Sequence, residues 1–290
     1  MSKVLCIYHG GCDDGFAAAW AVRRALGADV EFYEGVYQTP PPDCADRDVM
    51  LVDFSYKRPV LEEIARVAKS LLILDHHKTA AEDLAGFMTP PHWGIWHQAA
   101  IGGRLSISLR AAELFDMDRS GAGITWDYLR AGAPRPELIN LVEDRDLWRF
   151  HYPQTKAFSA ALRSYPQDFD VWDKLAENVP ALVGEGFAIQ RFYDQKIAEA
   201  RKFAYRHRIK GRDVLVCNAP YFMASDLAGE LAAGEPFAAT YYQTADNISV
   251  SLRSRAPDGV DVSEIAKAFG GGGHKHAAGF RVHRLADTDT

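Results

Sequence analysis

The sequence predicts an α/β protein with a parallel-sheet N-terminal domain and a smaller α/β C-terminal domain that contains a mixed sheet. In the N-terminal part, apolar runs alternate with helix-like segments at short spacing, which is typical of a parallel sheet with right-handed crossovers. The apolar run at residues 70–74 is what a strand buried on both faces requires. After residue 211, residues 237–243 and 247–253 alternate in polarity like a hairpin, between segments with helical patterns.

Composition and charge exclude some classes of protein. The chain has 290 residues, enough for two domains, and its net charge of -6 argues against a protein that coats long duplex nucleic acid. A phosphate substrate is still compatible, because bound metal ions can supply positive charge locally. The four cysteines form no C-x-x-C pair, which favours free thiols and a cytoplasmic location. We find no apolar run long enough for a signal peptide or a membrane span.

The first strand is expected at residues 4–8, and an alanine-rich helix follows at about residues 16–26. Between them lies a turn whose glycines let the backbone bend tightly and leave room for a ligand. The turn also carries His9, Asp13 and Asp14. These residues could form a metal site, or the acids could cap the helix and occupy its first turn, and the turn alone leaves both interpretations open.

Three further strands are expected at residues 30–37, 48–55 and 70–74. A buried strand does not carry an aspartate without a partner, so Asp53 either caps the helix expected at residues 57–68 or binds a ligand. The last of these strands runs directly into Asp75, His76 and His77. Open α/β sheets bind their ligands at the carboxyl ends of the strands, so these residues are candidate ligands.

The pattern is weaker from residue 78 to residue 105. Residues 90–97 are aromatic and read as a surface hairpin, with His92 and His97 as minor ligand candidates. Helices are expected from residue 120, at residues 137–142 and within residues 160–181. The charged segment after residue 142 reads as a solvated helix end, unless one of its acids faces the same site as Asp53.

A long helix with one apolar stripe is expected at residues 184–206. Its basic end, residues 201–212, reads as a solvated face with favourable charges at a helix C-terminus, or alternatively as a track for nucleic acid. The second domain then begins near residue 211. Its last helix, at residues 262–269, runs into four consecutive glycines followed by His274. That run is either an anion cradle of exposed amides or a helix C-cap with a flexible loop.

Six segments together resemble the DHH phosphoesterase family joined to its C-terminal DHH-associated domain, which includes RecJ-like nucleases and nano-RNases. The segments read HGGCDDG, VDFS, LDHHKT, VEDRDLW, SLRS and FGGGGHKHAAG, in this order along nearly the whole chain. The resemblance implies a catalytic metal-binding domain at residues 1–183, a linker helix at residues 184–210 and a substrate-binding domain at residues 211–290.

The resemblance also implies two divalent metal ions, manganese first, with zinc, iron, cobalt or magnesium as alternatives. His9 and Asp53 would hold one ion, and Asp53 would bridge to a second ion on Asp14, His76 and Asp144, with Asp146 as the alternative to Asp144. His77 would face the phosphate, and Asp75 would orient the histidines or act as a further ligand. The substrate's phosphate or terminal nucleotide would be gripped by Arg253, His274 and the glycine run Gly271, Gly272 and Gly273.

The first motif departs from the family, in which two aspartates are commonly separated by one residue. Aligning on Asp14 and Gly15 places Cys12 at the first acid, whereas counting forward from His9 places Asp13 there. The third ligand of the first metal is therefore either Cys12 or Asp13. A thiolate at this position would favour zinc or iron over manganese.

The family and the size of the chain predict a metal-dependent phosphodiesterase that cleaves short oligonucleotides, cyclic dinucleotides or a related small phosphoester. Two metals roughly 3.5–4 Å apart would activate the attacking water. The alternatives are a RecJ-like single-strand exonuclease, supported by the basic stretch, and a catalytically silent nucleotide-binding module, supported by the altered first motif. The expected partner is a short nucleic acid or nucleotide, without a membrane, and the oligomeric state stays open, a homodimer included.

Overall fold

The computed structural model describes residues 4–37, 39–87, 111–255 and 259–289. The chain forms two compact units, residues 1–190 and residues 191–290. The aromatic segment 90–97, with the ligand candidates His92 and His97, lies outside the described residues. None of the helices in the described ranges combines the length and the apolar character needed to span a lipid bilayer.

The N-terminal unit is built on a five-stranded parallel sheet, which confirms the predicted architecture of this domain. Its strand order is β2-β1-β3-β4-β5, so the chain reverses direction across the sheet between β1 and β3. The strands are β1 (Val4–His9), β2 (Val30–Gly35), β3 (Asp48–Val52), β4 (Ser70–Asp75) and β5 (Ala111–Phe115). In this kind of sheet, ligands bind beyond the carboxyl ends of the strands at the point where the order reverses.

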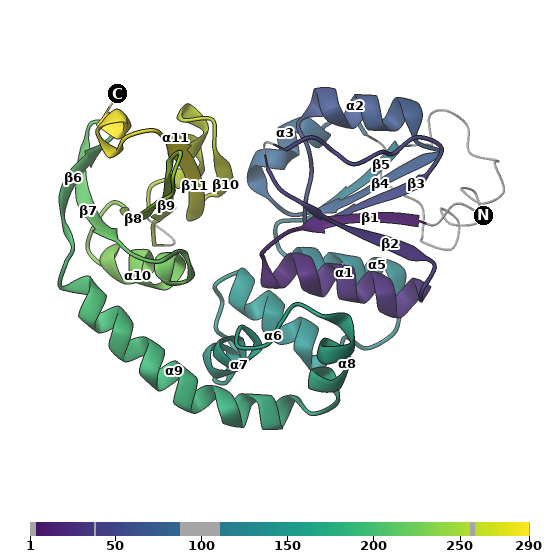
Figure 1. Ribbon diagram of the computed structural model, residues 1–290, viewed down its shortest axis with the longest axis horizontal. Helices are drawn as coiled ribbons and strands as arrows, with labels where there is room; N and C mark the ends of the chain where they lie inside the picture. The colour runs from purple at the N-terminus through teal and green to yellow at the C-terminus, as the bar shows by residue number, and fades with distance from the viewer. Residues whose placement is uncertain (1–3, 38, 88–110, 256–258, 290) are drawn as a thin grey trace. The chain divides into compact units, whose positions relative to one another are not determined.

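Helices cover both faces of this sheet (Figure 1). One face packs on α1 (Asp13–Leu26) and α5 (Gly121–Leu129), and the other face on α2 (Arg58–Val67) and α3 (Ala81–Leu84). Residues from β3 and β4 alternate between the two cores, as the two-residue period of a strand requires. The short 3-10 helix η1 (Lys78–Ala80) precedes α3, and α6 (Glu137–Asp146), α7 (Thr155–Leu162) and α8 (Phe169–Glu177) complete the unit.

The C-terminal unit contains a six-stranded mixed sheet in the order β10-β11-β9-β8-β7-β6, which confirms the predicted mixed sheet. Its strands are β6 (Tyr205–Ile209), β7 (Arg212–Asn218), β8 (Ala238–Gln243), β9 (Ile248–Arg253), β10 (Gly272–His274) and β11 (Ala277–Val282). The helices are α10 (Ala224–Leu231) and α11 (Val262–Ala268), with the 3-10 turns η3 (Tyr221–Met223) and η4 (Leu285–Asp289). Helices α10 and α11 pack in separate cores.

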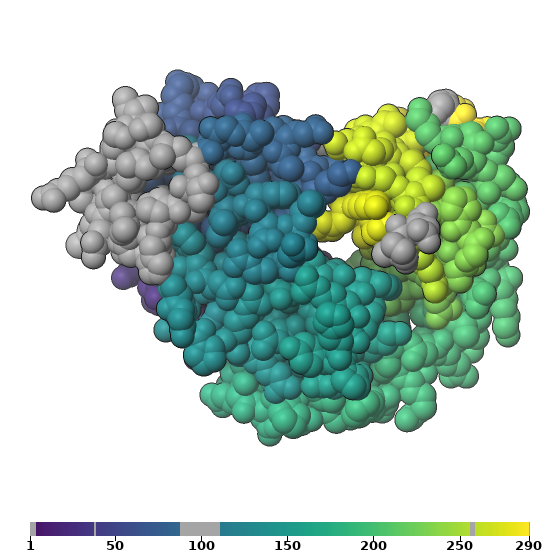
Figure 2. Space-filling model, turned by 180° about the vertical axis from the view of Figure 1, so that it is seen from behind, coloured from purple at the N-terminus to yellow at the C-terminus, as the bar shows by residue number. Residues whose placement is uncertain are grey.

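Helix α9 (Val179–Arg201) connects the two sheets along the chain, and it ends five residues earlier than the sequence predicts. Its first turns contribute Val179 and Leu182 to a core of the N-terminal unit, and its last turns contribute Ile197 to a core of the C-terminal unit. Much of the remaining helix surface is exposed (Figure 2). Part of the basic stretch that we expected at a helix end is strand: β6 occupies Tyr205–Ile209 and pairs with β7.

Candidate metal centre

Three neighbouring strands deliver polar side chains to the edge of the N-terminal sheet where the strand order reverses. His9 is the last residue of β1, Asp53 directly follows β3, and Asp75 ends β4 immediately before His76 and His77. Because parallel strands end at the same edge, side chains that are far apart in sequence meet there. The structure therefore brings together the candidate ligands His9, Asp53, His76 and His77.

Asp53 occupies the middle of this arrangement. Its two carboxylate oxygens point to different histidines: Oδ1 lies 3.0 Å from His76 Nε2, and Oδ2 lies 3.3 Å from His9 Nδ1. Asp53 is 1% exposed, and its φ of 55° is in the left-handed region, which is uncommon for a residue other than glycine. Such backbone strain persists only where surrounding structure imposes it, and it clusters at functional sites.

Within the described residues of the N-terminal unit, the side chains form two groups that could hold a metal ion. His9, Asp53 and His77 form the first, which we call the His9 group, and Asp14, His76 and Asp146 form the second, the Asp14 group. Within each group the ligand atoms lie within 4.8 Å of one another. Since Asp53 Oδ1 is also 3.0 Å from His76, this carboxylate lies between the two groups and can serve both.

The chemistry of these groups fits divalent cations. Among the described residues, both carboxylate oxygens of Asp53 and Oδ2 of Asp146 are buried without a hydrogen bond of good geometry. Burial and the neighbouring carboxylates of Asp53 and Asp146 raise the pKa of Asp14 well above its usual value. Burial also raises the pKa of Asp146. Buried acids that disfavour each other's charge are stabilised by a cation, and carboxylate with imidazole suits manganese and related metals.

His76 experiences the same concentration of negative charge. Burial lowers the pKa of His76, but Asp53, Asp146 and Asp14 around it raise that pKa to about 10. Its Nε2 lies 3.7 Å from Asp14 Oδ2 and 3.6 Å from Asp146 Oδ2. His76 is 1% exposed, so a satisfied surface histidine is excluded.

Asp75 fixes the orientation of the following turn. Its Oδ1 accepts hydrogen bonds from the backbone amides of His76 and His77, at 2.7 and 3.2 Å, and lies 2.8 Å from His77 Nδ1. Burial raises the pKa of Asp75, but His77 lowers it, to about 2, so Asp75 is an acceptor and His77 Nδ1 carries the proton. Nε2 is then the ring atom of His77 that can act as a ligand.

The structure corrects the expected role of Asp144. Its carboxylate accepts hydrogen bonds from the amides of His151 and Tyr152, at 2.8 and 3.3 Å, and from the hydroxyl of Thr155. Asp144 therefore holds the turn after α6, and Asp146, the alternative, faces His76. The physical reason is helical periodicity: two positions along a helix are separated by about 200° around its axis, so the two acids point in different directions.

The two alternative ligands at the start of α1, Asp13 and Cys12, have different surroundings. Asp13 Oδ2 lies 2.6 Å from Nε of Arg163, in an ion pair at the surface. The thiol of Cys12, in contrast, has its pKa raised by burial and by the charges of Asp53, Asp146 and Asp14. Among the described residues Cys12 belongs to neither ligand group. Asp13 is thus engaged at the surface, and which of the two residues supplies a metal ligand stays a prediction.

Two features of the site could not be identified from the motifs. Asp14 accepts hydrogen bonds from the amides of Gly121 and Ala122, at 2.6 and 3.1 Å, at the N-terminus of α5. Tyr37, which follows β2, places its ring 5.3 Å from that of His9. The only sequence signals were Ser120 as a helix N-cap and an aromatic residue just beyond the strand that neighbours β1.

In the C-terminal unit, the predicted substrate residues Arg253 and His274 lie on two strands that are separated by one strand, β11. His274 of β10 pairs with Ala277 of β11, and Ala277 pairs with Arg253 of β9, so the three residues form one row across the sheet. Arg253 is held by hydrogen bonds to Ser225 Oγ at 2.6 Å and to the Leu252 carbonyl at 2.7 Å. This row places Arg253 and His274 on the same face, with only the methyl group of Ala277 between them.

The glycine run has a different structure from the expected cradle of exposed amides. The amide of Gly271 donates to the Ala266 carbonyl at 2.9 Å and thereby closes the end of α11, and Gly272 and Gly273 belong to β10. A Cβ on Gly271 would lie 2.1 Å from the Gly279 carbonyl oxygen, and Gly273 has φ 137°. Close strand packing therefore requires glycine at residues 271 and 273, and the run ends in a strand and not in a flexible loop.

Comparisons with known proteins agree with this fold. Residues 222–289 match the family model of the DHHA1 domain. An uncharacterised protein of Acanthamoeba polyphaga mimivirus is 30% identical over 300 residues, and the match covers 94% of this chain but 66% of that relative, just under two thirds of its length. The solved structure of exonuclease RecJ bound to manganese has a TM-score of 0.51 and 17% identity, over 98% of this chain and 87% of that chain. An exopolyphosphatase-related protein of Bacteroides fragilis has a TM-score of 0.50 and 11% identity, over 99% and 89%.

Proposed function

We propose that this chain, which belongs to the DHH family and carries a C-terminal DHHA1 domain, is a metal-dependent phosphodiesterase that cleaves short oligonucleotides or small cyclic nucleotides. The observation that carries the proposal is the pair of ligand groups that meet at Asp53, where the strand order reverses. Two adjacent cation sites that share a carboxylate suit phosphoryl transfer, because both the attacking and the leaving oxygen need charge stabilisation.

The geometry of the two groups supports the following assignment of ligands. The His9 group would hold one divalent ion and the Asp14 group the other, with Asp53 as the bridging ligand, and manganese is the proposed metal. When bound, such ions supply an activated water at neutral pH and stabilise the charge that develops on phosphorus oxygens. Cys12 is proposed as a neighbour of this centre that would shift its preference towards zinc or iron if it ligates.

The chain's own residues prepare the site for that chemistry. The two Asp14 oxygens are held by the amides of α5, and the His77 ring is held by Asp75, so both side chains are oriented before substrate arrives. His77 is 13% exposed at its side chain, more than His76, so we propose that it faces the phosphate. The ring of Tyr37 lies beside that of His9, so we propose that Tyr37 contacts the substrate as well.

Arg253 and His274 are proposed to bind the non-scissile end of the substrate. Strands lie about 4.8 Å apart, so two residues separated by one strand are about 10 Å apart, a span that accommodates a phosphate and its sugar above Ala277. Guanidinium binds phosphate through two parallel hydrogen bonds, which suits Arg253 for the anion. We propose Gly271, Gly272 and Gly273 as supports of this surface, because they allow β10 to pack closely on β11.

The RecJ-like single-strand exonuclease is the second candidate, favoured by the fold of manganese-bound RecJ. Two arginines of the basic stretch are already engaged in ion pairs, Arg206 with Glu235 at 2.6 Å and Arg208 with Asp289 at 3.5 Å. Positive charge that is neutralised within the protein contributes less to binding of a long strand. This observation favours the short substrate. The silent binding module would hold fewer than two ions, and the two ligand groups argue against it.

The decisive experiment is a hydrolysis panel in manganese with short RNA, short DNA, cyclic dinucleotides, cyclic mononucleotides and pyrophosphate. We expect turnover of one short phosphodiester class and its loss in H76A and D53N, each checked for folding by circular dichroism. A surface variant, K69A, serves as the control with wild-type turnover. Absence of turnover on every substrate, with two bound ions, would contradict the phosphodiesterase. A steep preference for long single strands would select the exonuclease. Cytoplasmic location and a homodimer stay predictions from the sequence.

A further inference from the structure

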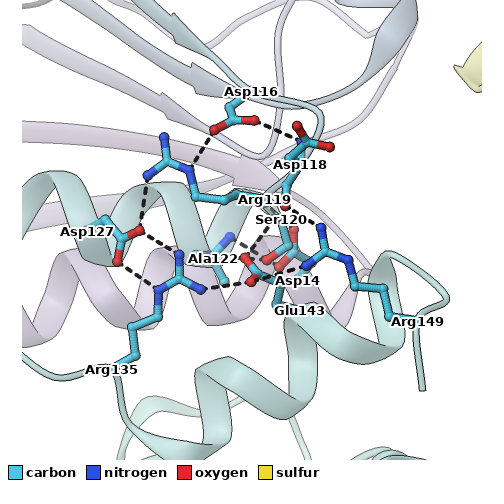
Figure 3. Close-up of polar contacts among 12 residues, drawn as sticks. Asp14, Asp116, Asp118, Arg119, Ser120, Ala122, Asp127, Arg135, Glu143 and Arg149 are labelled. Atoms are coloured by element: carbon cyan, nitrogen blue, oxygen red, sulfur yellow. Dashed lines mark hydrogen bonds and ion pairs between the residues drawn. The ribbon is translucent and has the colours of Figure 1, made fainter. Parts of the chain in front are cut away.

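A network of charged side chains extends to the turn whose amides hold Asp14 (Figure 3). We call it the Arg135 network, and its members are Asp116, Arg119, Asp127, Arg135 and Glu143. None of these residues belongs to either ligand group. Asp116 follows β5, Arg119 precedes α5, Asp127 lies on α5, Arg135 precedes α6 and Glu143 lies on α6, so the network ties one strand end to two helices.

Arg135 is the centre of the network because it bridges two acids from different helices. Its Nε and Nη2 contact the two oxygens of Asp127 at 2.7 and 2.5 Å, and its Nη1 contacts Glu143 Oε1 at 2.8 Å. Arg119 extends the network from Asp127 to Asp116. Its Nη1 lies 3.0 Å from Asp127 Oδ2, and its Nε lies 2.8 Å from Asp116 Oδ2. The planar guanidinium of Arg135 bonds both acids at once, so it fixes the distance and the angle between them. A single point charge would not fix the angle.

The second carboxylate oxygen of Glu143 connects the Arg135 network to the turn that holds Asp14. Glu143 Oε2 accepts a hydrogen bond from the amide of Ser120 at 3.0 Å, and the Ser120 hydroxyl in turn accepts from the amide of Gly123 at 3.2 Å. The next two amides, of Gly121 and Ala122, donate to Asp14. Consecutive amides of one turn therefore bind Glu143 on one side and the candidate ligand Asp14 on the other.

The space around this turn leaves little freedom. A Cβ placed on Gly123 would lie 2.0 Å from Glu143 Oε2, and a Cβ placed on Gly121 would lie 2.3 Å from the Cβ of Asp53. Glu143 therefore packs directly against the first turn of α5, and that turn packs directly against Asp53. A shift of Glu143 would move both Asp14 and Asp53.

We propose that Arg135 is a positioning residue, which acts through Glu143 and the N-terminus of α5 to set Asp14 for the cation of the Asp14 group. The inference rests on the proposed function. Without Arg135, Asp127 and Glu143 lose their shared counter-ion, and Glu143 turns towards solvent and releases the Ser120 amide. Arg149, 3.8 Å from Glu143, compensates only in part. A ligand that must lie within about 0.5 Å of its position then loses affinity for the ion.

The test is direct Mn²⁺ binding to the full chain, measured by equilibrium dialysis without substrate. We expect two ions on the wild type, and on R135M one ion with near wild-type affinity and one at least about 10-fold weaker. R135K, which keeps the charge but loses the two-pronged pairing, should fall between them. R66M is the matched control, because Arg66 pairs with Glu63 on the surface of α2, away from the centre.

A double-mutant cycle separates positioning from general destabilisation. If Arg135 acts through Glu143, then R135M/E143Q should bind the weaker ion no worse than R135M alone, because the pathway is already broken. Additive losses, or wild-type affinity of both ions in R135M, would overturn the proposal. If R135M does not fold, E143Q alone decides, since it must show the same selective loss. Fewer than two ions on the wild type would instead contradict the proposed function.

Discussion

Replacing Gly121 with alanine tests how closely the first turn of α5 and Asp53 are packed. The added Cβ would lie 2.3 Å from the Cβ of Asp53 and 2.7 Å from its Cα, both atoms that a side-chain rotation cannot remove. Gly121 has no left-handed backbone conformation, so alanine is strained only by this contact and not by φ.

The size of the effect follows from the displacement. An ordinary Cβ contact begins at 3.4 Å, so Asp53 and α5 must separate by about 1.1 Å. Productive sites tolerate about 0.5 Å, and a misplacement of about 1 Å costs roughly 100-fold in rate. The overpacking also costs about 1–3 kcal/mol of stability, partly offset by the better helix propensity of alanine. We therefore expect a fall of about 100-fold in Mn²⁺-dependent hydrolysis, with a folded protein.

The assay compares G121A with G184A, which adds the same methyl group in helix α9. No atom lies within 4 Å of a Cβ on Gly184, so this control should keep wild-type activity and gain a little stability. Mn²⁺ affinity, hydrolysis and urea unfolding are measured on all three proteins. Wild-type Mn²⁺ affinity in a folded G121A would refute the packing of α5 on Asp53 and the bridging role proposed for this carboxylate.

Three further predictions concern individual acids and one arginine. D146N should lose one Mn²⁺ ion without loss of stability, since the buried Oδ2 of Asp146 has no hydrogen bond. D144N should instead lose about 1–3 kcal/mol in urea unfolding because it weakens the turn after α6. The reverse pattern would restore Asp144 as the ligand. Burial raises the pKa of Asp127, but Arg135 and Arg119 hold it below 3.8, so its contribution is present above that pH and lost as the pH falls through its lower folded pKa. D127N should therefore be about 1 kcal/mol less stable than the wild type at pH 7, and the gap should close as the pH falls from about 4 towards 2; a gap independent of pH would exclude an electrostatic role. R253Q should raise KM with little change in kcat, with R284Q as the control, and an equal fall in kcat would contradict a role away from the scissile bond.

The sequence predicts the part of the fold that rests on local patterns. Four of the five strands of the parallel sheet are foreseen, because each is a short apolar run between turn residues. The fifth, β5, is missed since its two alanines and Glu113 lack the β-branched composition of a strand. The strand β6 is missed because its arginines were interpreted as the basic end of the preceding helix, and only the pairing with β7 identifies it as a strand.

The same limit explains which candidate site residues could be placed at one edge of the sheet from the sequence. His9, Asp53 and His76 sit at or just beyond the ends of strands, and the rule that parallel strands end at one edge brings them together without further information. Asp144 and Asp146 cannot be separated in that way. The expected helix ended at residue 142, whereas α6 continues to Asp146, so the helical rotation that distinguishes the two acids was not available.

The partner of Asp14 lies beyond any reasoning from local sequence. Its amide donors are 107 and 108 residues away, and they are backbone groups, which no residue type marks. Only Ser120 as an N-cap indicates that a helix begins there, and helix N-termini bind whichever acid the fold brings to them. In this chain the fold brings an acid from α1, so the first turn of α5 becomes part of the centre. A motif search that reads only side chains therefore recovers the candidate ligands and misses the scaffold that orients them.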